Sequence, residues 1–135
     1  MVARNGNLSM TETNFTSRLL RGLRRELPGA WVQKFNSFGG MVAGGIPDFC
    51  VATTERTSWF EVKLAGRKMF AGKNAKLQWE TLRRIGGRYV VWNVALKSGY
   101  VFAPGEWGSR VVNSAKAFDG LVAEIVAIAV AQREP

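Results

Sequence analysis

The sequence has 135 residues, enough for a single domain with its own core, and its 47% hydrophobic content argues against disorder for most of the chain. Its 19 Lys and Arg against 10 Asp and Glu give a net charge of +9, which favours a polyanionic partner, nucleic acid before membrane. The lack of His and the presence of 1 Cys exclude serine–histidine triads, histidine metal centres, cysteine zinc sites and disulfide frameworks. Any metal would therefore be held by oxygen ligands, for which Mg²⁺ or Mn²⁺ is the natural candidate.

The first expected helix follows a flexible leader at residues 1–8. Ser9 and Glu12 fit a capping box, with Ser9 as the N-cap and Glu12 at the third helical position. The helix is predicted to end at about Leu27, because Pro28-Gly29 follows it.

Two sides of this helix differ in chemistry. Its apolar side is formed by Phe15, Leu19, Leu23 and Leu27, and a basic flank is formed by Arg18, Arg21 and Arg25. At about 100° per residue, Glu12 projects on the apolar, inward side. Glu12 therefore has two interpretations: it closes the capping box, or it reaches inward as a third acid beside a metal.

Residues 46–64 are typical of an antiparallel hairpin, with two apolar runs on either side of a polar connector. A first strand is expected before it, over Ala30–Phe38, and a glycine-rich loop joins the two. If the hairpin turn is centred on Thr54 and Glu55, Asp48 falls opposite Glu61, with Cβ atoms roughly 4.5–5.5 Å apart. An odd number of loop residues would instead place the two acids on opposite faces.

Strand alternation places Trp59, Glu61 and Lys63 on one face of this hairpin. The pattern thus gathers two carboxylates and an ammonium group, and a hard divalent cation is the simplest ligand for such a patch. The alternative is ordinary solvent-facing sheet surface, on which alternating charges are common.

Elements beyond the hairpin begin with a basic, glycine-punctuated loop and a second helix. This helix is expected from an N-cap at Asn74 to Ile85, ended by Gly86-Gly87, with Gln78 at the border of its inner side. Its inner stripe is predicted to contain Leu77, Thr81, Leu82 and Ile85. The basic residues of the loop and the first turn are Arg67, Lys68, Lys73 and Lys76.

Two strands and a helix complete the chain. Strands are expected over Arg88–Ala95 and Tyr100–Ala103, and a final helix within Ser114–Gln132. The inward side of that helix is predicted to contain Leu121, Val122, Ile125, Val126 and Ala129. The order predicts an α/β fold: a helix, a three-stranded antiparallel meander, a crossover helix and further strands, plus the C-terminal helix, in a single domain spanning residues 1–135.

With these residues placed, the sequence resembles the PD-(D/E)XK nuclease superfamily. The resemblance depends on Pro47-Asp48, on Glu61-Val62-Lys63 and on Gln78 in the following helix. Gly86-Gly87 leads into the next strand, and the helix that carries Glu12 precedes the motif. Similarity covers roughly residues 9–107 and is greatest to small stand-alone VRR-NUC nucleases, then to Holliday-junction resolvases. It implies a restriction-endonuclease-like core.

The resemblance also implies roles for individual residues. Asp48 and Glu61 would hold Mg²⁺, with Mn²⁺ as a substitute and with help from the backbone carbonyl of Val62. Lys63 would contact the attacking water or the scissile phosphate, and Gln78 and Glu12 would complete the site. Beside two carboxylates, Lys63 is expected to be charged and to orient groups rather than act as the general base.

These observations predict a Mg²⁺-dependent DNA endonuclease that acts on branched or structured DNA, such as junctions and flaps. The alternative is a non-catalytic nucleic-acid-binding module with the same fold. The basic residues of the loop and the helix flank would contact phosphates, or form ordinary solvated surface. A homodimer is a further hypothesis, in which the C-terminal helix or an exposed strand at Tyr100–Ala103 forms the interface. Without a membrane-length apolar run or a signal peptide, we expect an intracellular location, in the cytoplasm or nucleoid.

Overall fold

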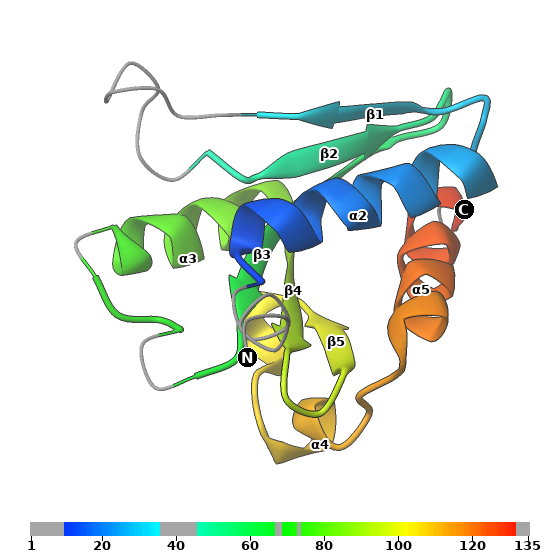
Figure 1. Cartoon of the computed structure of the whole chain (residues 1–135). Coiled ribbons are helices and arrows are strands. Elements are labelled where there is room, and N and C mark those ends of the chain that lie inside the picture. Colours follow the sequence, from blue (N-terminus) through cyan, green and yellow to red (C-terminus); the bar gives the residue numbers. More distant parts are fainter. Residues whose placement is uncertain (1–9, 36–45, 67–68, 73, 132–135) are drawn as a thin grey trace.

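The computed structural model describes residues 10–35, 46–66, 69–72 and 74–131, and it shows a mixed five-stranded sheet with helices on both faces (Figure 1). The elements in chain order are α2 (Glu12–Glu26), β1 (Trp31–Lys34), β2 (Phe49–Ala52), β3 (Thr57–Leu64), α3 (Ala75–Ile85), β4 (Arg88–Asn93), β5 (Ser98–Phe102), η1 (Pro104–Glu106), α4 (Ser109–Val112) and α5 (Phe118–Val130).

The strands lie in the order β1-β2-β3-β4-β5. β3 and β4 are parallel, and the other neighbouring pairs are antiparallel. α3 makes the crossover from β3 to β4, which a parallel pair requires. The predicted α/β fold, with a three-stranded meander, a crossover helix and further strands, is therefore confirmed.

One face of the sheet is closed by α2 and α5 over the larger apolar core. Phe15 of α2 stacks on Trp92 of β4, with ring centroids 5.0 Å apart, and Phe118 of α5 contacts the edge of both rings. Phe49 and Phe60 stack across β2 and β3 in the same core. The inward side predicted for α5 is confirmed, because Leu121, Val122, Ile125 and Ala129 are buried and Val126 packs against this core.

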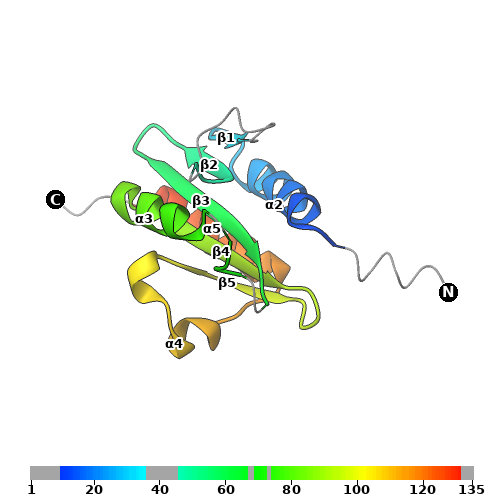
Figure 2. The same cartoon turned by 90° about the vertical axis from the view of Figure 1, so that its left-hand side faces the viewer.

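The opposite face is covered by α3, η1 and α4 (Figure 2). Its smaller core contains Leu82, Tyr89, Val91, Tyr100 and Phe102. The inner stripe predicted for α3 is wrong in part: Leu82 is buried, but Leu77 and Ile85 are 48% and 43% exposed. The helix is instead turned so that Trp79 packs on Tyr89 and Gln78 reaches β3.

The start of α2 also differs from the prediction. Thr11, rather than Ser9, is the N-cap: its backbone is extended, and its hydroxyl accepts a hydrogen bond of 3.0 Å from the Asn14 N–H. Glu12 is consequently the first residue of the helix and does not occupy the third position of a capping box. Ser9 itself lies outside the described residues.

Two predicted strands have different limits in the structure. β1 ends at Lys34, and most of the remaining segment predicted as strand, from residue 36, lies outside the described residues. β5 begins at Ser98 and is buried from Gly99 to Phe102, so the expectation of an exposed strand there is wrong. The short helices η1 and α4 were not predicted. Within the described ranges, no helix is both long and apolar enough to span a bilayer.

Candidate functional site

The register of the β2–β3 hairpin positions the two acids that the sequence singled out. Phe49 pairs with Phe60, and Ala52 pairs with Thr57, so the next position along places Asp48 opposite Glu61. The connector has four residues, and it is closed by a 2.8 Å hydrogen bond from the Thr53 N–H to the Arg56 carbonyl. The predicted register is therefore confirmed.

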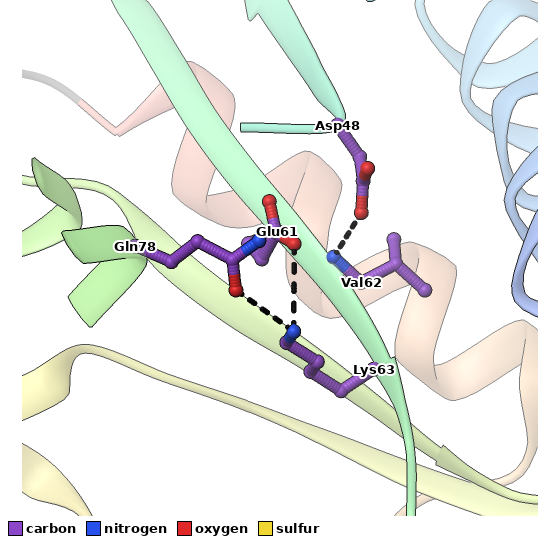
Figure 3. Close-up of polar contacts among 5 residues, drawn as sticks. All are labelled: Asp48, Glu61, Val62, Lys63 and Gln78. Carbon is purple, nitrogen blue, oxygen red and sulfur yellow. Dashed lines mark hydrogen bonds and ion pairs between the residues drawn. The ribbon is translucent and has the colours of Figure 1, made fainter. Parts of the chain in front are cut away.

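The Asp48 carboxylate lies where β2 and β3 begin to separate. Its Oδ2 accepts a 2.8 Å hydrogen bond from the backbone N–H of Val62 (Figure 3). Phe49 is the last residue of β2 that pairs with β3. Beyond it, the Asp48 side chain takes the place of a backbone carbonyl as the acceptor for the Val62 N–H. This contact fixes the carboxylate next to β3, and it uses the N–H of Val62. Metal binding by the Val62 carbonyl remains a prediction.

Glu61 is a buried acid in the middle of β3, only 5% exposed. Burial is the main cause that raises its pKa to about 8, and the negative charge of Asp48 raises it further. Burial likewise raises the pKa of Asp48. Lys63 acts in the opposite direction on both acids, but it does not compensate fully. The positive charge near the two acids is therefore too small to keep both of them ionised at their ordinary pKa values.

Lys63 connects Glu61 to α3. Its Nζ donates a 2.9 Å hydrogen bond to Gln78 Oε1 and lies 3.8 Å from Glu61 Oε2 (Figure 3). The side chain of Lys63 is only 14% exposed. Gln78 therefore holds the amine of Lys63 in place beside Glu61 from the helix side. The structure thus brings together Asp48, Glu61, Lys63 and Gln78.

Glu12 lies near these residues but not among them. It is exposed at the start of α2, and its charge raises the pKa of both Asp48 and Glu61. Among the described residues, no group of three or more His, Cys, Asp or Glu side chains could hold a metal ion together. Glu12 is therefore within electrostatic range of the pair, and its role as a third ligand stays a prediction.

The pair of acids fits a hard divalent cation. Mg²⁺ is commonly bound through one or two carboxylates, and water and substrate phosphate oxygens complete its coordination. Asp48 and Glu61 supply such a donor set. A bound cation would lower the raised pKa values of both acids, because positive charge favours the ionised form of each acid.

The basic residues predicted to bind DNA are dispersed. The Arg18 guanidinium lies 4.1 Å from the centroid of the Phe118 ring, and Arg25 lines a recess with Asp119, so both face α5. Arg21 is exposed on the same helix, and Lys76 is exposed in the first turn of α3. Arg67, Lys68 and Lys73 lie outside the described residues.

One basic residue near the acids was missed by the sequence interpretation. Lys34 pairs with Phe49 at the end of β1, and its charge lowers the pKa of Asp48. It is partly exposed, and the next residue, Phe35, donates a 2.8 Å backbone hydrogen bond to the Asp48 carbonyl. The available signal was strand pairing: a β1–β2 antiparallel register would have placed the end of β1 beside Asp48.

Comparisons with known proteins find similarity at the level of structure. No protein-family model and no curated protein matches the sequence. A solved structure of Hjc, a Holliday junction resolvase from the archaeal hyperthermophile Archaeoglobus fulgidus, is similar with a TM-score of 0.49 and 18% sequence identity. The alignment covers 79% of this chain and 98% of that chain. A similarity at this level assigns neither a substrate nor a residue role to this protein.

Proposed function

We propose that this protein is a metal-dependent endonuclease that hydrolyses phosphodiester bonds in DNA. The observation that supports it most is the pairing of buried Glu61 with Asp48 across β2 and β3, next to an ammonium group held by Gln78. Buried acids with raised pKa values at a defined charge cluster are typical of functional sites. A purely structural ion pair would not need the second acid.

The residues of the site would divide the chemistry between them. Asp48 and Glu61 would hold Mg²⁺, or Mn²⁺ in its place. The bound cation would supply charge neutralisation at the phosphate and activation of the attacking water. Lys63, held by Gln78 at 2.9 Å, would orient that water or contact a phosphate oxygen. The contacts of Lys63 support a role as a positioned hydrogen-bond donor.

Basic residues around the site would bind the DNA backbone. Lys34 beside Asp48 and Lys76 at the start of α3 lie on elements that flank the acids. Arg18, Arg21, Arg25, Arg67, Lys68 and Lys73 remain proposed contacts. Each phosphate contact adds to the salt dependence of binding, so we expect the affinity to fall steeply with salt concentration.

The replacement of Glu61 tests the proposed activity. Glu61→Ala should abolish Mg²⁺-dependent cleavage and leave DNA binding intact or tighter, because it removes a metal ligand and a negative charge near the phosphate. Glu55→Ala is the matched control, since Glu55 is an exposed acid in the turn of the same hairpin. Cleavage unchanged by Glu61→Ala would remove the assignment. Binding without any Mg²⁺-dependent cleavage by the wild type would favour the non-catalytic module.

The preferred DNA structure is a narrower part of the proposal. We propose branched DNA, on the family resemblance of the sequence to stand-alone VRR-NUC nucleases and junction resolvases. A panel of duplex, nicked, single-stranded, flap and four-way DNA, each with Mg²⁺ and with Mn²⁺, tests it directly. Equal rates on plain duplex and four-way DNA would contradict this preference. Light scattering at micromolar concentration tests the homodimer that a symmetric junction would suit.

A further inference from the structure

The hydroxyl group of Tyr89 is buried next to the proposed metal site and has no hydrogen-bond partner among the described residues. Tyr89 is in β4, its side chain is 0% exposed, and its Oη forms no hydrogen bond within the described residues. Its ring is fixed by Phe102, Phe70 and Trp79, with centroids 5.3, 5.2 and 5.6 Å away. A buried hydroxyl without a partner is costly, so the Tyr89 hydroxyl is a donor that a neighbouring acceptor could use.

Tyr89 and Glu61 lie side by side on adjacent strands. They are register partners in the parallel β3–β4 pair, and neighbouring strands lie about 4.8 Å apart. Both side chains lie on the face of the sheet that α3 covers, since Glu61 contacts Lys63 beside Gln78 and Tyr89 packs on Trp79. Burial, then the charge of Glu61, raises the pKa of Tyr89 to about 12, so the hydroxyl keeps its proton.

Glu61 needs a further donor when it is ionised. Lys63 Nζ is 3.8 Å away and donates its short hydrogen bond to Gln78 instead. The backbone of Asp48 lowers the pKa of Glu61, but by less than burial raises it. When one carboxylate oxygen binds a cation, the other oxygen is still buried. Carboxylate ligands of metals are generally hydrogen-bonded by residues around them.

We propose that Tyr89 is a positioning residue, whose hydroxyl donates a hydrogen bond to the Glu61 carboxylate when that carboxylate holds a divalent cation. This inference depends on the proposed metal site and adds a residue to it. Tyr89 would touch neither DNA nor the cation. It would set the direction of one ligand and satisfy its second oxygen.

Tyr89→Phe tests this role because it removes the hydroxyl and keeps the ring contacts. We define the Mg²⁺ midpoint as the Mg²⁺ concentration that gives a fixed rise in Tm, the same rise for every variant. In Tyr89→Phe we expect it to increase by about 10-fold, the lower end of what loss of such a hydrogen bond costs in metal affinity. The Tm without metal should stay the same or rise, because an unpartnered buried hydroxyl is gone. A Mg²⁺ midpoint within about 2-fold of wild type would overturn the proposal, whatever the Tm, since the expected loss is about 10-fold.

Ser58→Ala is the matched control. Ser58 Oγ is also buried and has no hydrogen-bond partner in the part of the chain that the structure describes. Ser58 is in the same strand as Glu61, three residues away. It should leave the Mg²⁺ midpoint unchanged. An equal shift of the midpoint in both variants would overturn the specific role of Tyr89.

A second measurement covers the case in which Tyr89→Phe does not fold. The chain has 2 Tyr, so 3-fluorotyrosine in a Tyr100→Phe background labels Tyr89 alone. Its ¹⁹F resonance should shift during the Mg²⁺ titration with the midpoint of the thermal shift, and a resonance that does not move would overturn the proposal. If the wild type shows no Mg²⁺-induced rise in Tm at millimolar concentration, the proposed metal site itself fails.

Discussion

The two faces of β3 show how one strand serves two purposes. On the face covered by α2 and α5, Phe60 and Val62 are completely buried in an apolar core. On the face covered by α3, Glu61 and Lys63 are also largely buried, but they are ionisable groups, and Lys63 is hydrogen-bonded to Gln78. The first face can stabilise the fold through burial alone. The second face retains buried ionisable groups that lower the stability of the fold, which is expected of a site kept for binding or catalysis.

The largest expected effect is on the apolar face. Phe60→Ala should lower the free energy of unfolding by about 3–5 kcal/mol, because it opens a cavity beside Phe49 and breaks the stacked pair. Urea denaturation measures this loss. If the faces serve separate purposes, any folded Phe60→Ala protein should keep the wild-type Mg²⁺ midpoint. A changed midpoint would show that the two faces are coupled.

A second comparison is internal to α3. Leu82→Ala should cost about 2–5 kcal/mol because Leu82 is 1% exposed, whereas Leu77→Ala should cost less than about 0.5 kcal/mol because Leu77 is 48% exposed. Both are Leu-to-Ala changes in one helix, so intrinsic helix propensity is matched. Equal losses in thermal or urea unfolding would contradict the orientation of α3.

The buried acid on the face covered by α3 should make the stability of the protein depend on pH. The pKa of Glu61 is about 8 in the folded protein against 4.5 ordinarily, so the folded state binds more protons than the unfolded state between these values. Stability of the metal-free protein should therefore fall as pH rises from about 5 to 8, by an amount on the order of a few kcal/mol.

Glu61→Gln should remove most of this fall in stability, and Mg²⁺ should reduce it in the wild type. Glu55→Gln serves as the control, because Glu55 is exposed in the hairpin turn. Urea unfolding of the three proteins at both ends of the pH range is the measurement. A wild-type stability that rises with pH would contradict the buried, poorly compensated state of Glu61.

The smallest expected effect concerns the start of α2, next to the site. Thr11→Ala should cost about 1 kcal/mol through the lost cap to the Asn14 N–H. Ser9→Ala should be close to neutral if Thr11 is the N-cap. The opposite result would restore the capping box of Ser9 and Glu12, and with it the original explanation of Glu12.

Local patterns were sufficient for the hairpin and for the pair of acids. Alternation of apolar and polar residues in residues 57–64, together with an even connector, determines that Asp48 faces Glu61, and the structure has that register. The same holds for the limits of α3, since Asn74 and Gly86 occupy its two caps as expected. These features depend on neighbours in sequence or on one turn, so the sequence alone contains the necessary information.

The orientation of α3 and the surroundings of Glu61 were decided by the tertiary structure. From helical periodicity alone, Leu77, Leu82 and Ile85 are equally suited to the inward side of α3. In the structure, Lys63 and Tyr89 of the sheet lie under this helix. Their contacts with Gln78 and Trp79 place these two residues on the inward side. Lys34 approaches Asp48 only because β1 pairs with β2, and Tyr89 approaches Glu61 only because α3 returns the chain to a parallel strand. Contacts between segments far apart in sequence depend on which surfaces meet, and no local pattern records that choice.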